Sequence, residues 1–149
     1  MNGWNPQDTE MLTRLFVATL CGGLIGLERE IHGKVAGLRT HALVSLGSAL
    51  IMLVSIDIYS AYRGVATVDP SRIAAQVVSG IGFLGAGAII RFPTGITGLT
   101  TAASLWVVAA IGLASGAGFF KPVLVTTVLV LMVFILFAQV GRYFGWKDV

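Results

Sequence analysis

Long apolar stretches dominate the chain, and its polar residues gather between them. The apolar stretches cover about residues 11–27, 41–59, 72–90, 99–117 and 123–140. A helix that crosses a bilayer needs about 20 mostly apolar residues, in a range of about 17–25. The stretches do not alternate apolar and polar residues, as the strands of a membrane β-barrel must. The pattern therefore predicts an all-α polytopic membrane protein, in which one domain over residues 1–149 contains about five transmembrane helices.

The polar breaks carry ordinary helix start and stop signals. Asp69-Pro70-Ser71 precedes the third stretch, and proline in a first turn beside Asp and Ser is typical of a helix start. Residues 91–95 (RFPTG) form a turn signal, and Lys121-Pro122 separates the fourth stretch from the fifth. Arg142, Trp146 and Lys147 follow the last stretch, where they are expected to anchor it at the membrane interface.

Composition excludes a soluble domain. Hydrophobic residues make up 56% of the chain and charged residues only 11%, whereas a soluble domain carries roughly 25% charged residues. The net charge of +3 comes from cations scattered at segment ends, so no nucleic-acid partner is expected. Cys21 is the single cysteine, which excludes a disulfide within the chain. The polar start, MNGWNPQDTE, lacks the basic region of a cleavable signal peptide.

The distribution of Lys and Arg predicts the orientation in the membrane. Cytoplasmic loops carry an excess of these residues. The first link, the third link and the tail hold six of them, and the opposite side holds four. We therefore expect a bacterial inner-membrane protein with its N-terminus outside and its C-terminus in the cytoplasm. The six are Arg29, Lys34, Arg39, Arg91, Arg142 and Lys147, and the four are Arg14, Arg63, Arg72 and Lys121.

A glycine motif in the third stretch matches a nucleotide-binding pattern only in letters. Gly80-Ile-Gly82-Phe-Leu-Gly85 reads GxGxxG, but no Asp or Glu lies between Asp69 and Asp148 to hold a ribose. Small residues instead let membrane helices approach closely, and a helix broken at mid-membrane is the alternative. The glycines expected to serve helix packing are Gly22, Gly26, Gly80, Gly82, Gly85, Gly87, Gly112 and Gly116.

The richest polar cluster covers residues 28–41 between the first two helices. A solvated loop is one interpretation, and a site at the membrane surface is the other. In such a site Glu28 and Glu30 are weak candidates for holding Mg²⁺, which keeps several waters when bound to carboxylates. Arg29 and Arg39, together with Arg91, are candidates for binding an anion or a lipid phosphate. The neighbouring Thr40 and His41 complete the cluster, and His41 can titrate near neutral pH.

Polar residues also recur along the third and fourth helices. Arg72, Gln76 and Ser79 share one helix face, and Thr97, Thr101 and Ser104 share another, with Thr100 beside them. Hydrogen bonds between helices are one interpretation of these residues, and a small polar cavity between the two helices is the other. No nucleophile–base pair or metalloprotease motif occurs, so we do not expect an enzyme.

Four sequence blocks resemble the N-terminal membrane domain of the MgtC/SapB family. They are GGLIGLERE at 22–30, AGLRTHALVSLGSAL at 36–50, RIAAQVVSGIGFLGAGAII at 72–90 and GLTTAASLWVVAAIGLASGAG at 98–118. The resemblance covers about residues 11–140, and together the blocks are specific. The positions that it marks are Glu28, Arg29, Arg39, Thr40, His41, Arg72, Gln76, Gly82, Gly85, Thr100 and Thr101.

The resemblance implies a five-helix domain of the bacterial inner membrane. It also implies a role in magnesium homeostasis and growth in low magnesium, inhibition of ATP synthase through membrane contact, and a link to virulence in pathogens. Many members carry an ACT-like C-terminal domain, which is not expected here. We therefore predict a regulator that acts through helix contacts with another membrane protein, with lipid around it and a homodimer as one arrangement. A small transporter or channel for Mg²⁺ or another solute is the alternative, and an enzyme acting on lipid head groups lacks a nucleophile.

Overall fold

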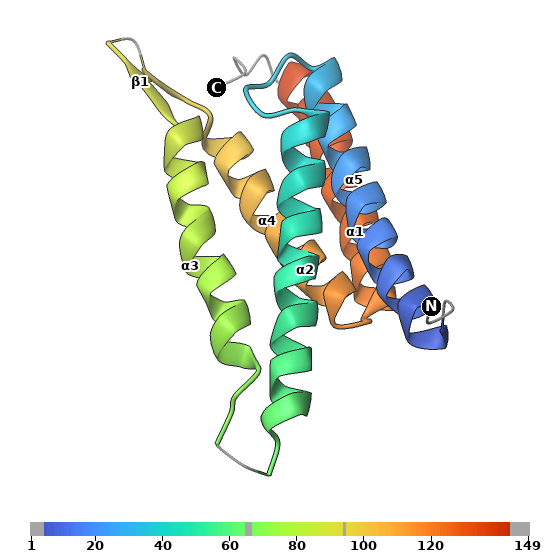
Figure 1. Ribbon diagram of the computed structural model, residues 1–149. Coiled ribbons are helices and arrows are strands. Elements are labelled where there is room, and N and C mark those ends of the chain that lie inside the picture. Colours follow the sequence, from blue (N-terminus) through green and yellow to red (C-terminus); the bar gives the residue numbers. More distant parts are fainter. Residues whose placement is uncertain (1–4, 65–66, 94, 144–149) are drawn as a thin grey trace.

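Five helices and one small β-ribbon make up the part of the chain that the structure describes. The structure is a computed structural model that describes residues 5–64, 67–93 and 95–143. The helices are α1 (Pro6–Ile31), α2 (Leu38–Tyr62), α3 (Ser71–Ala88), α4 (Leu99–Gly116) and α5 (Phe120–Tyr143). They form one elongated bundle (Figure 1). The interface anchor predicted at Arg142, Trp146 and Lys147 lies outside the described side chains.

The helical class is confirmed, and the chain is membrane-embedded. Within the described ranges, four helices are long and apolar enough to cross a membrane, namely α1, α2, α4 and residues Phe120–Val140 of α5. α3 does not meet the same criterion, although the sequence predicted a fifth span there. Its Arg72 and Gln76 lower the mean hydropathy, and its glycines contribute little apolar surface.

A short antiparallel ribbon replaces the simple turn that was expected between α3 and α4. β1 (Ile90–Phe92) pairs with β2 (Gly95–Thr97), so that Arg91 lies opposite Ile96. The chain returns into α4 at Gly98, whose φ of 88° is left-handed. A Cβ atom at this position would lie 1.9 Å from the Ala88 carbonyl oxygen. Only glycine fits this junction, and no sequence pattern pointed to it.

The first helix begins and ends further out than its apolar stretch. At its start, the Asp8 amide donates to Asn5 Oδ1 and the Asn5 amide donates to Asp8 Oδ2, each at 2.9 Å. This reciprocal capping box satisfies amides that a helix start leaves free. At its end α1 continues through Ile31. The predicted polar cluster is therefore mostly helical, and only residues 32–37 connect α1 to α2.

α4 is the central helix, and it contacts each of the other helices. Cys21 and Ile25 of α1 pack with Val108 and Ile111 of α4 and with Val123 of α5. On another side of α4, Leu105 and Ala109 pack with Ile81 and Ala88 of α3 and with Ala36 of the first link. The buried Cys21 thiol is free and belongs to the core.

Four of the predicted packing glycines lie where helices touch. A Cβ atom on Gly112 would lie 2.2 Å from the Ser45 carbonyl oxygen, and one on Gly22 would lie 2.6 Å from Ser45 Cβ. Gly26 and Gly116 lie similarly close to backbone atoms at the start and middle of α2. The three helices α1, α2 and α4 therefore approach at backbone distance, which any side chain at these positions would prevent.

The glycines of α3 do not share this role within the described chain. A Cβ atom added to Gly80, Gly82 or Gly87 would have no neighbour within 4 Å, and one on Gly85 would meet only Ala102, at an ordinary 3.6 Å. α3 is also an unbroken helix through all four glycines. Within the described bundle Gly80, Gly82 and Gly87 therefore touch no other helix, so their role in helix packing stays a prediction.

The polar links with most cations gather at one end of the bundle. The α1–α2 link, the β1–β2 ribbon and the end of α5 lie at the same end in Figure 1. The N-terminus, the α2–α3 link and the α4–α5 turn lie at the other end. We call the first of these the polar end. The bundle thereby brings together the segments whose charges predicted a cytoplasmic side.

Candidate functional site at the polar end of the bundle

A fully buried histidine lies at the centre of the polar end. His41, in the first turn of α2, is 0% exposed. Its Nδ1 lies 2.9 Å from the Gly37 carbonyl oxygen, and its Nε2 lies 2.9 Å from Ser104 Oγ on α4. Ser104 Oγ also lies 2.7 Å from the Thr101 carbonyl oxygen. This chain of contacts, the His41 network, joins α2 to the first turns of α4.

The His41 network can hold the imidazole in either protonation state. A carbonyl oxygen only accepts, so the hydrogen on the Gly37 side belongs to Nδ1. In the neutral imidazole, Nε2 accepts the Ser104 hydroxyl hydrogen. In the imidazolium, Nε2 donates to Ser104 Oγ, and that hydroxyl turns to donate to the Thr101 carbonyl. Rotation of the Ser104 hydroxyl is therefore sufficient for the network to accommodate a proton on His41.

A buried ion pair lies at the last turn of α1. Glu28 and Arg29 are both buried, and Arg29 Nε donates to Glu28 Oε2. His32 Nδ1 lies 3.0 Å from Glu28 Oε1, and 2.8 Å from the Glu28 carbonyl oxygen. The Arg29 guanidinium stacks over the Phe134 ring of α5 at 3.7 Å from its centroid. Aromatic stacking and a carboxylate on one edge hold the guanidinium in a single plane.

The two carboxylates proposed as magnesium ligands take separate partners. Glu28 faces Arg29 and His32, whereas the exposed Glu30 accepts the Leu38 amide at 2.7 Å and so caps the start of α2. Residues two positions apart point to different sides of a helix. Among the described residues, no group of three or more His, Cys, Asp or Glu side chains is placed to hold a metal ion. The donors present do not fit a protein-bound Mg²⁺ at this position.

The remaining candidates are spread over the bundle. Arg39 and Thr40 are exposed on the first turn of α2, and Arg72 is exposed at the start of α3. Gln76 lines a groove between α2 and α3. Thr100 and Thr101 line a cavity beside Arg29, and not a cavity between α3 and α4. The structure therefore brings Arg29, Thr100 and Thr101 together and leaves Arg72 and Gln76 apart from them.

The cavity beside Arg29 has a volume of about 550 Å³, and we call it the Arg29 cavity. α1 and the first link contribute cations to it, the start of α4 contributes hydroxyl groups, and α5 contributes an apolar wall. The polar lining residues are Arg29, His32, Lys34, Thr97, Thr100 and Thr101, and Phe134 and Phe137 are among the apolar ones. Among the described residues that line this cavity there is no Asp or Glu.

Several members of this site gave no signal in the sequence. Phe134 lies in the plainest apolar stretch, where an aromatic residue has no distinguishing pattern. In the sequence Lys34 is one of several loop cations, and Gly98 lies in no recognisable motif. Ser104 was noted as a polar position on α4, but its partner His41 could not be read from spacing. These contacts depend on how α1, α2, α4 and α5 cross.

The groove between α2 and α3 has a different character. Its volume is about 600 Å³, and it opens between the two helices along their apolar sides. Gly47 of α2 and Gly80 of α3 contribute small surfaces to it, and Val77 and Ile51 contribute apolar ones. Gln76 provides a side-chain amide there. We call it the α2/α3 groove.

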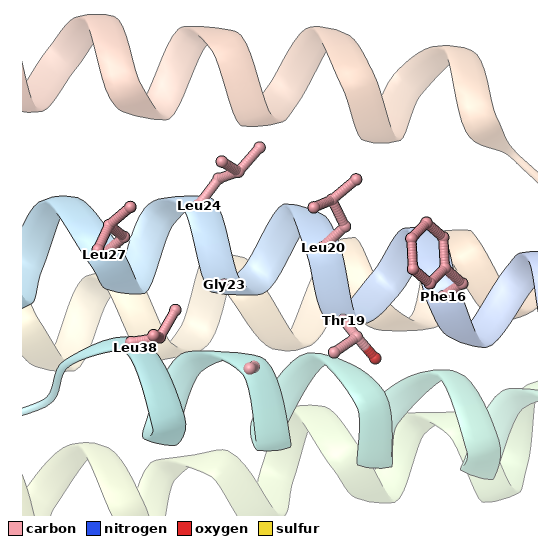
Figure 2. Close-up of a pocket in the computed structure, with 8 residues that line it drawn as sticks. Phe16, Thr19, Leu20, Gly23, Leu24, Leu27 and Leu38 are labelled. Carbon is pink, nitrogen blue, oxygen red and sulfur yellow. The ribbon is translucent and has the colours of Figure 1, made fainter.

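A smaller groove follows the outer side of α1 and the start of α2. It holds about 310 Å³, and its side chains include Phe16, Leu20, Leu24 and Leu38 (Figure 2). Thr19 is its single hydroxyl-bearing residue and donates to the Leu15 carbonyl of its own helix at 2.8 Å. Because this hydroxyl is engaged within its own helix, the groove presents a mainly apolar surface that suits lipid chains.

Comparisons with known proteins identify what the chain is similar to. The family model described as the MgtC family matches residues 15–143. The chain is 48% identical over 134 residues to the Escherichia coli (strain K12) protein named "Putative magnesium transporter YhiD", covering 87% of this chain and 61% of that protein. It is 44% identical over 131 residues to Protein MgtC of Salmonella typhimurium (strain LT2), covering 88% of this chain and 54% of that one.

A third relative, an uncharacterized protein of Haemophilus influenzae, is 40% identical over 149 residues, covering 97% of this chain and 63% of that protein. The chain thus spans a little over half of the length of the curated relatives it matches. No solved structure matches the chain.

Proposed function

The chain belongs to the MgtC family, and from this premise we propose that it is a non-enzymatic protein of magnesium homeostasis that regulates another membrane protein by contact. The magnesium link is supported by the name of the Escherichia coli relative, which describes a magnesium transporter. The partner proposed from the family resemblance is the ATP synthase. A bacterial inner membrane, with the polar end in the cytoplasm, is the proposed location.

The packing of the polar core is the observation that supports a regulator over a transporter. His41, Ser45, Ser48 and Ser55 form a buried polar face on α2. Glycines let the neighbouring helices pack directly against this face. A Cβ atom on Gly112 would lie only 2.2 Å from the Ser45 carbonyl oxygen. Mg²⁺ sheds water reluctantly and usually keeps several ligand waters. Because α2 and α4 pack at backbone distance along this face, there is no room between them for such an ion.

The α2/α3 groove is the surface proposed for contact with a partner helix. Helices associate in membranes through small residues and polar groups that hydrogen-bond between helices. The groove combines Gly47 and Gly80 with the Gln76 amide. α3 also leaves Gly82 and Gly87 uncovered, which supports a homodimer as a second arrangement for the same face.

A small magnesium transporter is the second candidate. It is favoured by the name of the Escherichia coli relative and by the buried hydroxyl groups of α2, which are uncommon in a lipid-facing helix. In that case α2 and α4 have to separate near Ser45 during transport. The two functions therefore differ in whether purified protein moves Mg²⁺ without a partner.

Reconstitution in liposomes that contain a fluorescent magnesium indicator tests this difference. A regulator gives no Mg²⁺ entry above that of protein-free liposomes, while a known magnesium channel in parallel liposomes gives a clear signal. Entry that Gln76→Leu or Glu28→Gln abolishes would instead support the transporter.

A photo-crosslinking residue at Val77, in the α2/α3 groove, tests partner contact in native membranes. The matched control places the same residue at Val128, an exposed apolar position of α5. The proposal expects a discrete adduct, identified by mass spectrometry as an ATP synthase subunit, from position 77 only. Equal, diffuse labelling from both positions contradicts a specific contact at the groove.

A further inference from the structure

We infer that the Arg29 cavity binds the phosphate group of an anionic ligand. The ligand is either free phosphate from the cytoplasm or the head group of an anionic phospholipid, since both present the same tetrahedral oxyanion. The inference is independent of the regulatory role proposed above. It depends on the donors that converge on this cavity from α1 and α4.

Arg29 provides the central donor. It is only 5% exposed, yet it lines the cavity. A guanidinium carries five N–H donors. Among the described residues, Nε is occupied by Glu28, and the two terminal nitrogens make no hydrogen bond. Because Arg29 lines the cavity, water or a ligand in the cavity can accept from these donors. Two terminal N–H groups on one edge match two oxygens of a phosphate.

Stacking on Phe134 fixes the orientation of the Arg29 guanidinium before a ligand binds. The ring lies 3.7 Å from the guanidinium carbon, and Glu28 holds the Nε side. The side chain therefore does not have to become ordered when a ligand binds. Glu28 cancels part of the Arg29 charge, but it occupies the Nε side and is not among the residues that line the cavity.

Thr101 adds a second polar group to the same cavity. It is 3% exposed, and its hydroxyl is a further polar group of the cavity lining. It lines the cavity together with Thr97 and Thr100. A threonine hydroxyl can donate one hydrogen bond and accept others. A phosphate oxygen in the cavity would accept a hydrogen bond from Thr101.

The start of α4 adds positive potential at the same place. α4 has 18 residues, begins at Leu99, and has no side-chain cap, because its N-cap residue is Gly98. The first amides of a helix have no partner within the helix and attract anions. Lys34 and His32 add further positive or neutral donors, and the described lining residues include no carboxylate. Charge and donor geometry both select an oxyanion over a cation.

The apolar wall from α5 makes a phospholipid possible as the source. Phe137 and Val133 of α5 line the cavity together with the donors of α1 and α4, so a phosphate with an attached apolar group fits as well as a free one. Two measurements distinguish these sources. One is binding of inorganic phosphate to the purified full chain in phosphatidylcholine nanodiscs. The other is native mass spectrometry of lipids retained from membranes that contain phosphatidylglycerol.

Two mild substitutions and one control make the test specific. Thr101→Val removes the buried hydroxyl and keeps the shape of the side chain. Lys34→Gln removes a cation that the first link contributes to the cavity. Arg91→Gln removes a cation from the exposed ribbon at the same end, outside the cavity. Thermal unfolding in detergent verifies that each variant is folded, and Arg29→Lys is added if Thr101→Val does not fold.

The wild-type chain is expected to bind phosphate or to retain phosphatidylglycerol. Thr101→Val should weaken this binding about tenfold, because it removes one hydrogen bond to a charged group. Lys34→Gln weakens it less, and Arg91→Gln has no effect. Phosphate binding assigns the free anion, and selective lipid retention assigns the head group. Absence of both, or equal loss in the Arg91→Gln control, overturns the inference.

Discussion

His41 and Ser104 join α2 to α4 through a contact of 2.9 Å between Nε2 and Oγ, inside a membrane bundle. The imidazole is fully buried, and its other nitrogen is held by the Gly37 carbonyl. This pair connects the first turn of α2 to the helix that every other helix contacts. It also places a group that can accept a proton next to the Arg29 cavity, since Thr101 belongs to both.

Replacing Ser104 by alanine tests the His41 network. The substitution leaves His41 Nε2 without its partner, and an unsatisfied buried group costs about 1–3 kcal/mol. We expect a lower thermal midpoint in detergent, measured by circular dichroism. Ser79→Ala removes a hydroxyl from an exposed position of α3 and serves as the control. Equal effects of the two substitutions would show that the contact with His41 adds no stability.

Two glycine substitutions separate close packing from helix propensity. Gly112→Ala places a Cβ atom 2.2 Å from the Ser45 carbonyl oxygen, so α2 and α4 must move apart. Gly80→Ala meets nothing within 4 Å and gains helix propensity of about 1 kcal/mol. We therefore expect Gly112→Ala to lower the free energy of unfolding and Gly80→Ala to maintain or raise it. The opposite order in a detergent unfolding series would contradict the packing described above.

Gly98 and Gly64 provide a similar comparison for the left-handed backbone. Their φ angles are 88° and 92°, so alanine is strained at either position by roughly 1–2 kcal/mol. At Gly98 the added Cβ also collides with the Ala88 carbonyl oxygen at 1.9 Å, whereas at Gly64 it meets no atom within 4 Å. Gly98→Ala should therefore be clearly the more destabilising in thermal unfolding. A similar loss for both would mean that the α3–α4 junction can rearrange.

Acid should weaken the start of α3 through Asp69. The Ser71 hydroxyl and the Ser71 amide both donate to Asp69 Oδ1, at 2.7 and 2.8 Å, and they hold the pKa of this exposed carboxyl below its usual value. A lowered pKa in the folded state means that the stabilisation is present above about pH 4 and is lost as pH falls through the folded pKa.

The measurement for Asp69 is stability against pH in detergent. Asp69→Asn should remove this part of the acid dependence below about pH 4. Ser71→Ala should reduce it, because one of the two donors is lost. An unchanged acid profile in both variants would show that this turn makes no contribution to stability.

Cysteine labelling tests the predicted orientation. Cys21 is buried, so its background reaction with a membrane-impermeant maleimide should be low. Lys34→Cys at the polar end should react only after the cells are permeabilised, and Lys121→Cys at the other end should react in intact cells. The reverse pattern would place the Arg29 cavity outside the cytoplasm, where a cytoplasmic phosphate could not reach it.

The helices themselves were largely readable from the sequence, whereas their ends were not. A long apolar run in hydrocarbon must satisfy its own backbone hydrogen bonds, and a helix does this locally. The polar composition of residues 28–31 predicts a link, but they continue α1, because Arg29 stacks on Phe134 and Glu28 pairs with Arg29. Burial against other helices therefore extended a helix that local composition would have ended.

The candidate site was only partly readable. Arg29 and Thr101 were selected as separate candidates, and their common cavity depends on α1, α4 and α5 meeting at one end. Gln76 was selected with them but lines the α2/α3 groove. Glu30 was selected as a metal ligand but caps α2. Residue type indicated polarity correctly, whereas partners separated by many residues depend on how the helices cross.

The sequence by itself determined the membrane class, the helical segments and the family, because apolar runs and local motifs are properties of contiguous residues. The tertiary structure decided which glycines bring helices together, where α3 leaves its glycines uncovered, and which donors converge beside Arg29. The physical reason is that helix crossing positions residues far apart in the chain. Gly22 and Gly80 look alike as letters, yet one touches Ser45 and the other meets no atom within 4 Å.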